Sequence, residues 1–265
     1  MSLPVSVARG YARLLVLSAS AVVALSVQTA AHADELVVSA AASLTNAFRG
    51  IATAFEKTHP STKVVLNLGA SDVLLQQIVA GAPADVFASA DEKAMDKAVD
   101  AKAVVPGTRR DFATNSLVLV VPADSTLPAG SLRDTLALPQ VKHVALGDPA
   151  SVPAGRYAKA ALEHAGAWEI VNGKAVLAAN VRESLDYVAR GEAEAGFVFG
   201  TDAAMMPNAV KVAAIVPTPT PVIYPIAVVQ GSAHAAEASA FAQFVLSPDG
   251  QKILAKYGFQ PPAAH

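Results

Sequence analysis

The stretch "VVSAAASLTNAF", Val37 to Phe48, contains the transition that decides the fold class. An apolar, β-rich run ends in three alanines, Ser43 follows, and an amphipathic helical pattern begins at Leu44. A serine at this position predicts a helix N-cap, because its hydroxyl can accept a hydrogen bond from the first turn. The same hydroxyl could instead face a ligand. The stretch therefore predicts a strand-to-helix junction with two possible uses for Ser43.

Short β-rich runs alternate with helical patterns along the rest of the chain, which predicts an α/β fold with mostly parallel sheets. The expected strands are Leu36–Ser39, Lys63–Leu68, Asp85–Ala88, Ser116–Val121, His143–Leu146, Ala195–Val198, Lys211–Ile215 and Val222–Val229. The expected helices are Leu44–Lys57, Val73–Val79, Glu92–Ala101, Gly155–His164, Val181–Arg190, Ala235–Leu246 and Asp249–Tyr257.

Two proline-rich joints, Pro122 to Pro128 and Val216 to Pro225, indicate how the chain is divided. Only about 40 residues follow the second joint, too few for an independent domain, so we expect them to complete an earlier one. The predicted organisation is a first lobe of residues 34–114 plus 223–265 and a second lobe of residues 115–222. Two lobes joined by crossing segments place a ligand cleft between them.

The N-terminus has the pattern of a secretory signal. Arg9 and Arg13 precede an apolar run from Leu14 to Val27, and small residues follow as far as Ala33. The alternative is a membrane anchor, but the run is shorter than the roughly 20 residues that span a bilayer. We therefore expect residues 1–33 to be cleaved and the mature protein to be exported and soluble.

Composition excludes several classes of function. Removing residues 1–33, which hold two arginines and no acid, leaves 18 basic and 22 acidic side chains, a net charge of −4. This balance argues against nucleic acid or an anionic membrane as a partner. The chain has no cysteine, and it lacks the HExxH, GxSxG and Walker A motifs. The residues alone therefore indicate none of these catalytic sites, and turnover by the purified protein would identify an enzyme.

Four predicted strand-to-helix junctions place small or polar residues at a helix start. The first turn of a helix has unpaired N–H groups and the positive end of the helix dipole. Several such ends directed into one cleft could bind an anion without a cationic side chain, although plain capping explains any single junction. Arg156 and Arg182, in two of these first turns, are expected to be exposed or to form a salt bridge between lobes. The junctions are at Ser43, at Ser71 with Asp72, at Pro153-Ala154-Gly155, and at Asn180, the expected cap, with Val181 as the first helical residue.

Six stretches in order carry a family resemblance. They are "AAASLTNAF", "AGAPADVFASAD", "NSLVLVVP", "LGDPASVPAGRYAKAAL", "GFVFGTDA" and "YPIAVV" with "KYGF". Together they resemble the periplasmic molybdate-binding proteins of the ModA family, from about Leu36 to Phe259, nearly the whole mature chain.

The resemblance implies a type II periplasmic binding-protein fold that captures molybdate, and often tungstate, for an inner-membrane ABC permease. It also implies that neutral hydrogen bonds in the interlobe cleft hold the oxyanion, with no further cofactor, and we expect a monomer. The positions that match the family's ligand contacts are Ser43, Ser71, Ala154, Val181 and Phe199. The two serines would contribute hydroxyl groups, and Ala154 and Val181 would contribute backbone N–H groups.

The sequence departs from the family pattern at Phe199, where the resemblance implies a tyrosine. A hydrogen bond to an anion is worth about 1.5–3 kcal/mol, so a missing hydroxyl matters unless another group replaces it. The backbone of Phe199, Thr201, a water molecule or Tyr157 could do so.

Other solutes are the competing interpretation. Sulfate and phosphate are tetrahedral oxyanions like molybdate, and a cavity of fixed size would distinguish them. A ferric site would need converging tyrosines, whereas the tyrosines here are isolated in the sequence. Molybdate and tungstate are nearly equal in size, so the sequence does not rank them.

Overall fold

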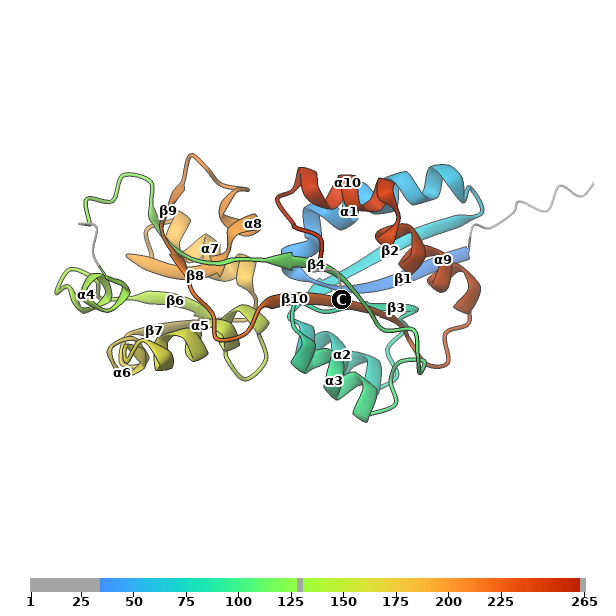
Figure 1. Cartoon of the computed structure of the whole chain (residues 1–265), viewed down its shortest axis with the longest axis horizontal. Coiled ribbons are helices and arrows are strands. Elements are labelled where there is room, and N and C mark those ends of the chain that lie inside the picture. The colour runs from blue at the N-terminus through green and yellow to red at the C-terminus, as the bar shows by residue number, and fades with distance from the viewer. Residues whose placement is uncertain (1–33, 128–130, 263–265) are drawn as a thin grey trace, which may run out of the picture. The chain divides into compact units, whose positions relative to one another are not determined.

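The computed structural model describes residues 34–127 and 131–262, and the expected signal segment, residues 1–33, lies outside the described residues. Within these ranges the chain forms two five-stranded sheets (Figure 1). The strand order of the first is β2 (Thr62–Gly69), β1 (Asp34–Ala41), β3 (Val86–Ala88), β10 (Val222–Val228) and β4 (Arg110–Asn115). The strand order of the second is β7 (Ala175–Ala178), β6 (Val144–Gly147), β8 (Ala195–Phe199), β5 (Leu117–Pro122) and β9 (Val210–Val216). No helix in this part of the chain combines the length and the apolar character needed to cross a membrane.

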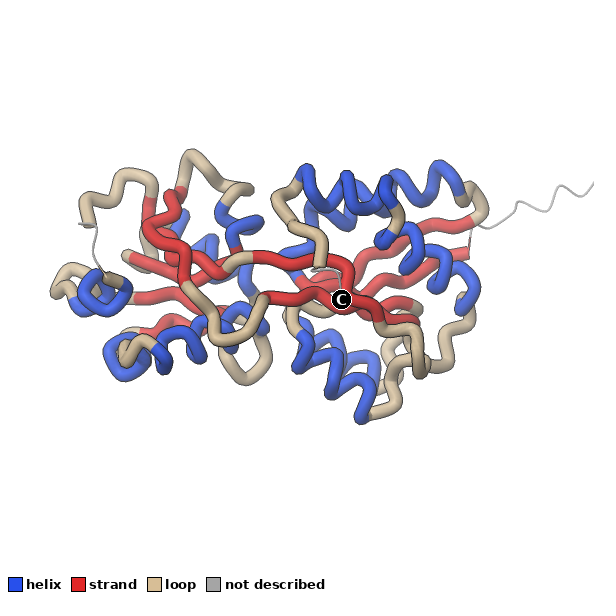
Figure 2. Tube along the Cα trace, viewed as in Figure 1, coloured by secondary structure: helices blue, strands red, loops and turns tan. Residues whose placement is uncertain are grey.

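The first sheet combines three parallel strands with two antiparallel ones. The parallel strands are β1 (Asp34–Ala41), β2 (Thr62–Gly69) and β3 (Val86–Ala88), and the antiparallel ones are β4 (Arg110–Asn115) and β10 (Val222–Val228). Helices cover both faces, as Figure 2 shows. These helices are α1 (Thr45–Thr58), α9 (Ala235–Leu246) and α10 (Pro248–Lys256) on one face, and α2 (Ser71–Val79) and α3 (Glu92–Asp100) on the other.

The second sheet repeats this plan. Its parallel strands are β6 (Val144–Gly147), β7 (Ala175–Ala178) and β8 (Ala195–Phe199), and its antiparallel strands are β5 (Leu117–Pro122) and β9 (Val210–Val216). The helices α5 (Pro153–His164) and α7 (Val181–Ala189) pack against it. The short helices are α4 (Leu132–Ala137), α6 (Trp168–Asn172) and α8 (Gly200–Ala203).

The predicted α/β class with two lobes is confirmed, but both sheets are mixed rather than mostly parallel. The reason lies in the two crossings. At the first, β4 of one sheet continues through Ser116 into β5 of the other, and at the second, β9 continues through the proline-rich joint into β10 (Figure 1). These four strands pair antiparallel with their neighbours, whereas the strands connected by helices pair in parallel.

The predicted strands and helices match observed ones to within one or two residues at most ends. The sequence pattern missed β4, β7 and the short helices. The stretch "RDFATN" of β4 is half polar, and "AVLA" of β7 is too short to show a period. Both strands depend on pairing with sheet neighbours that are distant in the sequence.

Aromatic side chains pack where the two sheets are connected. Tyr224 of β10 is fully buried, and its ring meets Phe112, Phe199 and Phe259 edge-on at centroid distances of 6.2, 5.8 and 5.4 Å. Phe199 belongs to the second sheet and the other three residues to the first lobe. Edge-to-face packing of this kind is favourable and directional, so it fixes the end of β8 against β10.

Candidate anion-binding site

A small cavity lies where the carboxyl ends of the parallel strands of both sheets meet, and its empty volume of about 200 Å³ includes space open to solvent. In open α/β sheets, this edge is where ligands bind. Every lining residue follows or ends one of the six parallel strands. The lining consists of Ala41 at the end of β1 with Ala42 and Ser43 after it, Gly69 at the end of β2 with Ala70 and Ser71 after it, Ala90 after β3, Val152, Pro153 and Ala154 after β6, Asn180 and Val181 after β7, and Phe199 at the end of β8.

Ser43 is not the N-cap that its position in the sequence suggests. It lies inside a short 3-10 turn, Ala42–Leu44, and Leu44 occupies the cap position of α1. This extra turn separates the serine from the first turn of α1, so its hydroxyl serves another partner. Ser43 Oγ lies 3.0 Å from the hydroxyl of Tyr224, and the residue is 2% exposed.

Ser71 also leaves the end of its helix uncapped. It is the first residue of α2, and Ala70 precedes it without a side-chain cap. The Ser71 Oγ accepts a hydrogen bond of 3.1 Å from the backbone N–H of Ala90, and the residue is fully buried. Because an N–H group can only donate, the proton of the Ser71 hydroxyl is left for another acceptor.

Two residues at helix starts line the cavity, Ala154 in α5 and Val181 in α7. The side-chain oxygen of Asn180 caps α7 by accepting from Arg182 and Glu183 at 2.9 and 3.1 Å, as the sequence predicted. No residue of the described chain accepts a hydrogen bond from the N–H of Val181 or of Ala154. These two N–H groups are therefore available at the positive ends of two helices.

Gly155 allows the start of α5 to approach the sheet. A Cβ atom at this residue would lie 1.8 Å from the carbonyl oxygen of Gly147, the last residue of β6. Any larger side chain would push α5 away from β6. The N–H of Ala154 would then move away from the cavity.

Phe199 brings no hydroxyl to the cavity. It is 1% exposed, and its ring contacts Tyr157 at 6.3 Å as well as Tyr224. Neither Tyr157 nor Thr201 lines the cavity: the Tyr157 hydroxyl donates to the carbonyl of Pro221, and Thr201 Oγ1 accepts from Asn115. Two of the suggested replacements for the family's tyrosine hydroxyl are thus engaged elsewhere.

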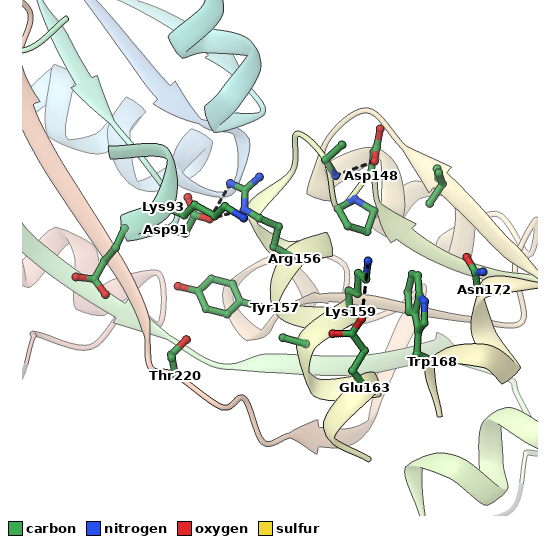
Figure 3. A pocket seen from close by; sticks show the side chains of 15 residues that line it. Asp91, Lys93, Asp148, Arg156, Tyr157, Lys159, Glu163, Trp168, Asn172 and Thr220 are labelled. Atoms are coloured by element: carbon green, nitrogen blue, oxygen red, sulfur yellow. Dashed lines mark hydrogen bonds and ion pairs between the residues drawn. The ribbon is translucent and has the colours of Figure 1, made fainter. Parts of the chain in front are cut away.

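No lysine or arginine lines the cavity, but Arg156 lies just beyond it, in α5. Its Nη2 is 2.6 Å from Asp72 Oδ2 and 2.7 Å from Asp91 Oδ2, both in the first lobe, and Figure 3 shows the guanidinium directed at Asp91. Lys97 also pairs with Asp72 at 2.5 Å. Arg156 therefore forms the salt bridge between lobes that the sequence left as one of two options.

The positive charge of Arg182, at the start of α7, is also paired with a carboxylate. Its Nε lies 2.5 Å from Asp202 Oδ1, and its Nη2 donates to the carbonyl of Ser43 at 3.4 Å. Burial raises the pKa of Asp202 to about 6, although the positive charge of Arg182 opposes that rise. Both arginines next to the cavity thus have carboxylate partners, and the cavity itself presents neutral donors.

A larger hollow beside α5 is a poorer place for an anion. Its empty volume is about 1590 Å³, part of it open to solvent, and Figure 3 shows Lys159 and Trp168 on one side of it and the ion pair of Arg156 on the other. Its lining carries no excess of positive charge for a dianion, because four carboxylates outnumber three cations: Asp91, Glu92, Asp148 and Glu163 against Lys93, Arg156 and Lys159. Within residues 34–127 and 131–262, no group of three or more His, Cys, Asp or Glu side chains could hold a metal cation.

Comparison with known proteins agrees with this geometry. Residues 36–260 match the family model for bacterial extracellular solute-binding proteins, and two lobes with a small cavity between them fit this class of protein. The chain is 43% identical to the molybdate-binding protein ModA of Escherichia coli over 92% of this chain and 96% of that protein. It is 34% identical to the ModA protein of Haemophilus influenzae, over 86% and 91% of the two chains.

Solved structures show the same fold. The periplasmic molybdate-binding protein of Azotobacter vinelandii superposes with a TM-score of 0.73 at 27% identity, covering 86% of this chain and 99% of that one. The sulfate-binding protein SubI of Mycobacterium tuberculosis, at 21% identity and a TM-score of 0.75, shares the fold alone. The chain therefore belongs to the ModA family of molybdate-binding proteins, which bind solutes for transport and are not enzymes.

Proposed function

We propose that this protein captures molybdate, and also tungstate, in the small cavity between its lobes. The observation that carries the proposal is the donor set of the cavity. Ser43, Ser71, Ala154 and Val181 line one space that has no cationic side chain in its lining, and the two hydroxyls and two N–H groups of these residues would be its donors. Fixed donors at helix starts stabilise an oxyanion, and neutral donors allow it to be released again.

Selectivity follows from size and not from charge. Molybdate and sulfate carry the same charge, but molybdate is larger, so a cavity of fixed donors that fits molybdate leaves sulfate with stretched hydrogen bonds. The donors here lie at the starts of two helices that are fixed in place. Gly155 allows α5 to pack closely against β6, and the Asn180 cap fixes the start of α7. Phe199 adds an apolar wall, so we propose a site with fewer side-chain donors than the tyrosine-containing family pattern.

Delivery would use the closed form of the protein. We propose that residues 34–114 with 223–265 and residues 115–222 move as two lobes, and that bound oxyanion favours their closure. An inner-membrane ABC permease would then recognise the closed monomer in the periplasm, after cleavage of residues 1–33. Contacts across the cleft, such as Arg156 with Asp72, support a closed state with its own stabilising interactions.

Calorimetry with molybdate, tungstate and sulfate in parallel, on protein that begins at Asp34, tests the proposal. We expect molybdate and tungstate to bind with nanomolar to micromolar dissociation constants and sulfate to bind far more weakly. Sulfate binding as tight as molybdate binding would refute the selectivity, and absence of molybdate binding would refute the function.

A further inference from the structure

The hydrogen-bond partners of Ser43 point beyond the site itself, to two residues outside the cavity. Within the described chain, the Tyr224 hydroxyl is the one hydrogen-bond partner of Ser43 Oγ, at 3.0 Å. Tyr224 is fully buried, does not line the cavity, and also receives a hydrogen bond of 3.2 Å from the side-chain amide of Asn115. Asn115 ends β4, at the first crossing between the lobes.

The direction of each hydrogen bond in this chain can be deduced. The Asn115 Oδ1 accepts from the backbone N–H of Ser116 at 2.9 Å, which fixes the orientation of the amide, since a backbone N–H only donates. The NH₂ group of Asn115 therefore faces Tyr224, and the tyrosine oxygen is an acceptor of that bond. The Tyr224 proton is then directed at Ser43 Oγ.

We propose that Asn115 and Tyr224 are positioning residues that set the Ser43 hydroxyl as a hydrogen-bond donor toward the cavity. Because Ser43 Oγ accepts from Tyr224, its own proton is left for the bound oxyanion. Ser71 reaches the same state by another route, since its oxygen accepts from the backbone N–H of Ala90. Burial keeps the Tyr224 proton in place by raising the pKa of this hydroxyl well above its ordinary value.

The hydrogen-bonded chain from Asn115 through Tyr224 to Ser43, called the relay below, begins at Asn115, which contacts both lobes. The Asn115 amide also donates to Thr201 Oγ1 of α8 at 2.8 Å, so one side chain joins the crossing, the second lobe and Tyr224. A dianion that needs donors alone benefits from hydroxyls that are already oriented, because no proton has to be redirected on binding. This inference rests on the proposed function, as it assigns the residues that prepare the same site.

The first test removes the relay without removing a ring. Tyr224→Phe keeps the packing on Phe112, Phe199 and Phe259 but loses the hydroxyl. We expect molybdate binding to weaken by about threefold to tenfold, the range for one neutral hydrogen bond. Tyr157→Phe is the matched control: it deletes a buried hydroxyl from a ring that also meets Phe199, but that hydroxyl bonds to Pro221 and to neither serine.

A double-mutant cycle separates positioning from packing. In a Ser43→Ala background, Tyr224→Phe should cause no further loss of affinity, because the group on which it acts is absent. Asn115→Asp reverses the relay, since a carboxylate accepts the Tyr224 proton and leaves Ser43 to donate to the tyrosine oxygen. The loss of molybdate affinity that Asn115→Asp causes should be at least about threefold larger with Ser43 present than in the Ser43→Ala background. Equal losses in both backgrounds would overturn the proposal.

Neutron diffraction of the deuterated, ligand-free protein examines the relay independently of molybdate. We expect a deuteron on Tyr224 Oη directed at Ser43 Oγ. A deuteron on Ser43 directed at Tyr224 would overturn the relay even if molybdate binds. Failure of the unmutated protein to bind molybdate, with the relay seen as expected, would instead refute the proposed function.

Discussion

Arg156 Nη2 lies 2.6 Å from Asp72 Oδ2, so a helix of the second lobe is ion-paired to a helix of the first across the candidate site. Arg156 follows Ala154 by two positions, and Asp72 follows Ser71 by one. The side chains of the pair are only 12% and 5% exposed. The contact can exist only while the lobes are together, and we infer that it stabilises the closed form.

Arg156→Gln should therefore weaken molybdate binding, because closure would leave Asp91 in the cleft without its cation and Asp72 paired with Lys97 alone. Removing one partner of a buried ion pair is costly, and we expect a loss of affinity of about tenfold or more by calorimetry. Lys159→Gln is the matched control, because it makes the same charge change on α5 at a half-exposed residue away from the cavity. Equal affinity of the Arg156 variant and the control would contradict a role in closure.

Each serine of the cavity should contribute a measurable share of the binding free energy. Ser43→Ala and Ser71→Ala are each expected to cost about 1–3 kcal/mol in molybdate binding, measured by calorimetry, because each removes a donor to an anion. Ser184→Ala provides the comparison: it deletes a buried hydroxyl that donates to the carbonyl of Phe197, away from the cavity. Normal binding by both cavity variants would show that the anion lies elsewhere.

The local part of the site could be predicted from the sequence because helix starts are encoded by short stretches. Serine, Pro-Ala-Gly and Asn-Val follow β-rich runs, and Ser71, Ala154 and Val181 do line one cavity with Ser43 and Phe199. The cap at Asn180 was also predictable, since an Asn before a helix bonds to residues two and three positions later.

What the sequence could not show are contacts between distant residues. The partner of Ser43 is 181 positions away, and a local pattern therefore suggested a cap where the structure has a bond to Tyr224. Arg156 reaches Asp91 over 65 positions in the same way. The one available signal for Tyr224 was a polar aromatic residue within the otherwise apolar run of β10.

Restoring the family's tyrosine at position 199 tests the apolar wall. Phe199 lines the cavity, so Phe199→Tyr is expected to add a donor and to tighten molybdate binding by about threefold to tenfold. Calorimetry measures the affinity, and thermal unfolding of the ligand-free variant reports whether the hydroxyl is accommodated among the rings of Tyr157 and Tyr224. Lower stability without tighter binding would mean that the hydroxyl is directed into those rings and not at the ion.

Asp202 should make the protein less stable as the pH rises from about 4 to about 6. Its pKa is raised by burial from 3.8 to about 6, so over this interval the folded chain holds a proton that the unfolded chain has released. The free energy of unfolding falls with rising pH wherever the folded state binds more protons than the unfolded state. The stability that protonated Asp202 contributes is therefore lost as the pH rises through its folded pKa. Carboxyl groups with lowered pKa values, such as Glu56 and Glu194, act in the opposite direction.

The comparison with Asp202→Asn isolates this group, because the other carboxyls are common to both proteins. Urea unfolding between pH 4 and pH 7 measures the free energy of unfolding of both proteins. The value for Asp202→Asn should lack the fall with rising pH that protonated Asp202 causes. The difference between the two free energies should therefore change by about 1.4 kcal/mol for each of about two pKa units. A difference that stays constant over this range would show that Asp202 is ionised throughout and that Arg182 outweighs the effect of burial.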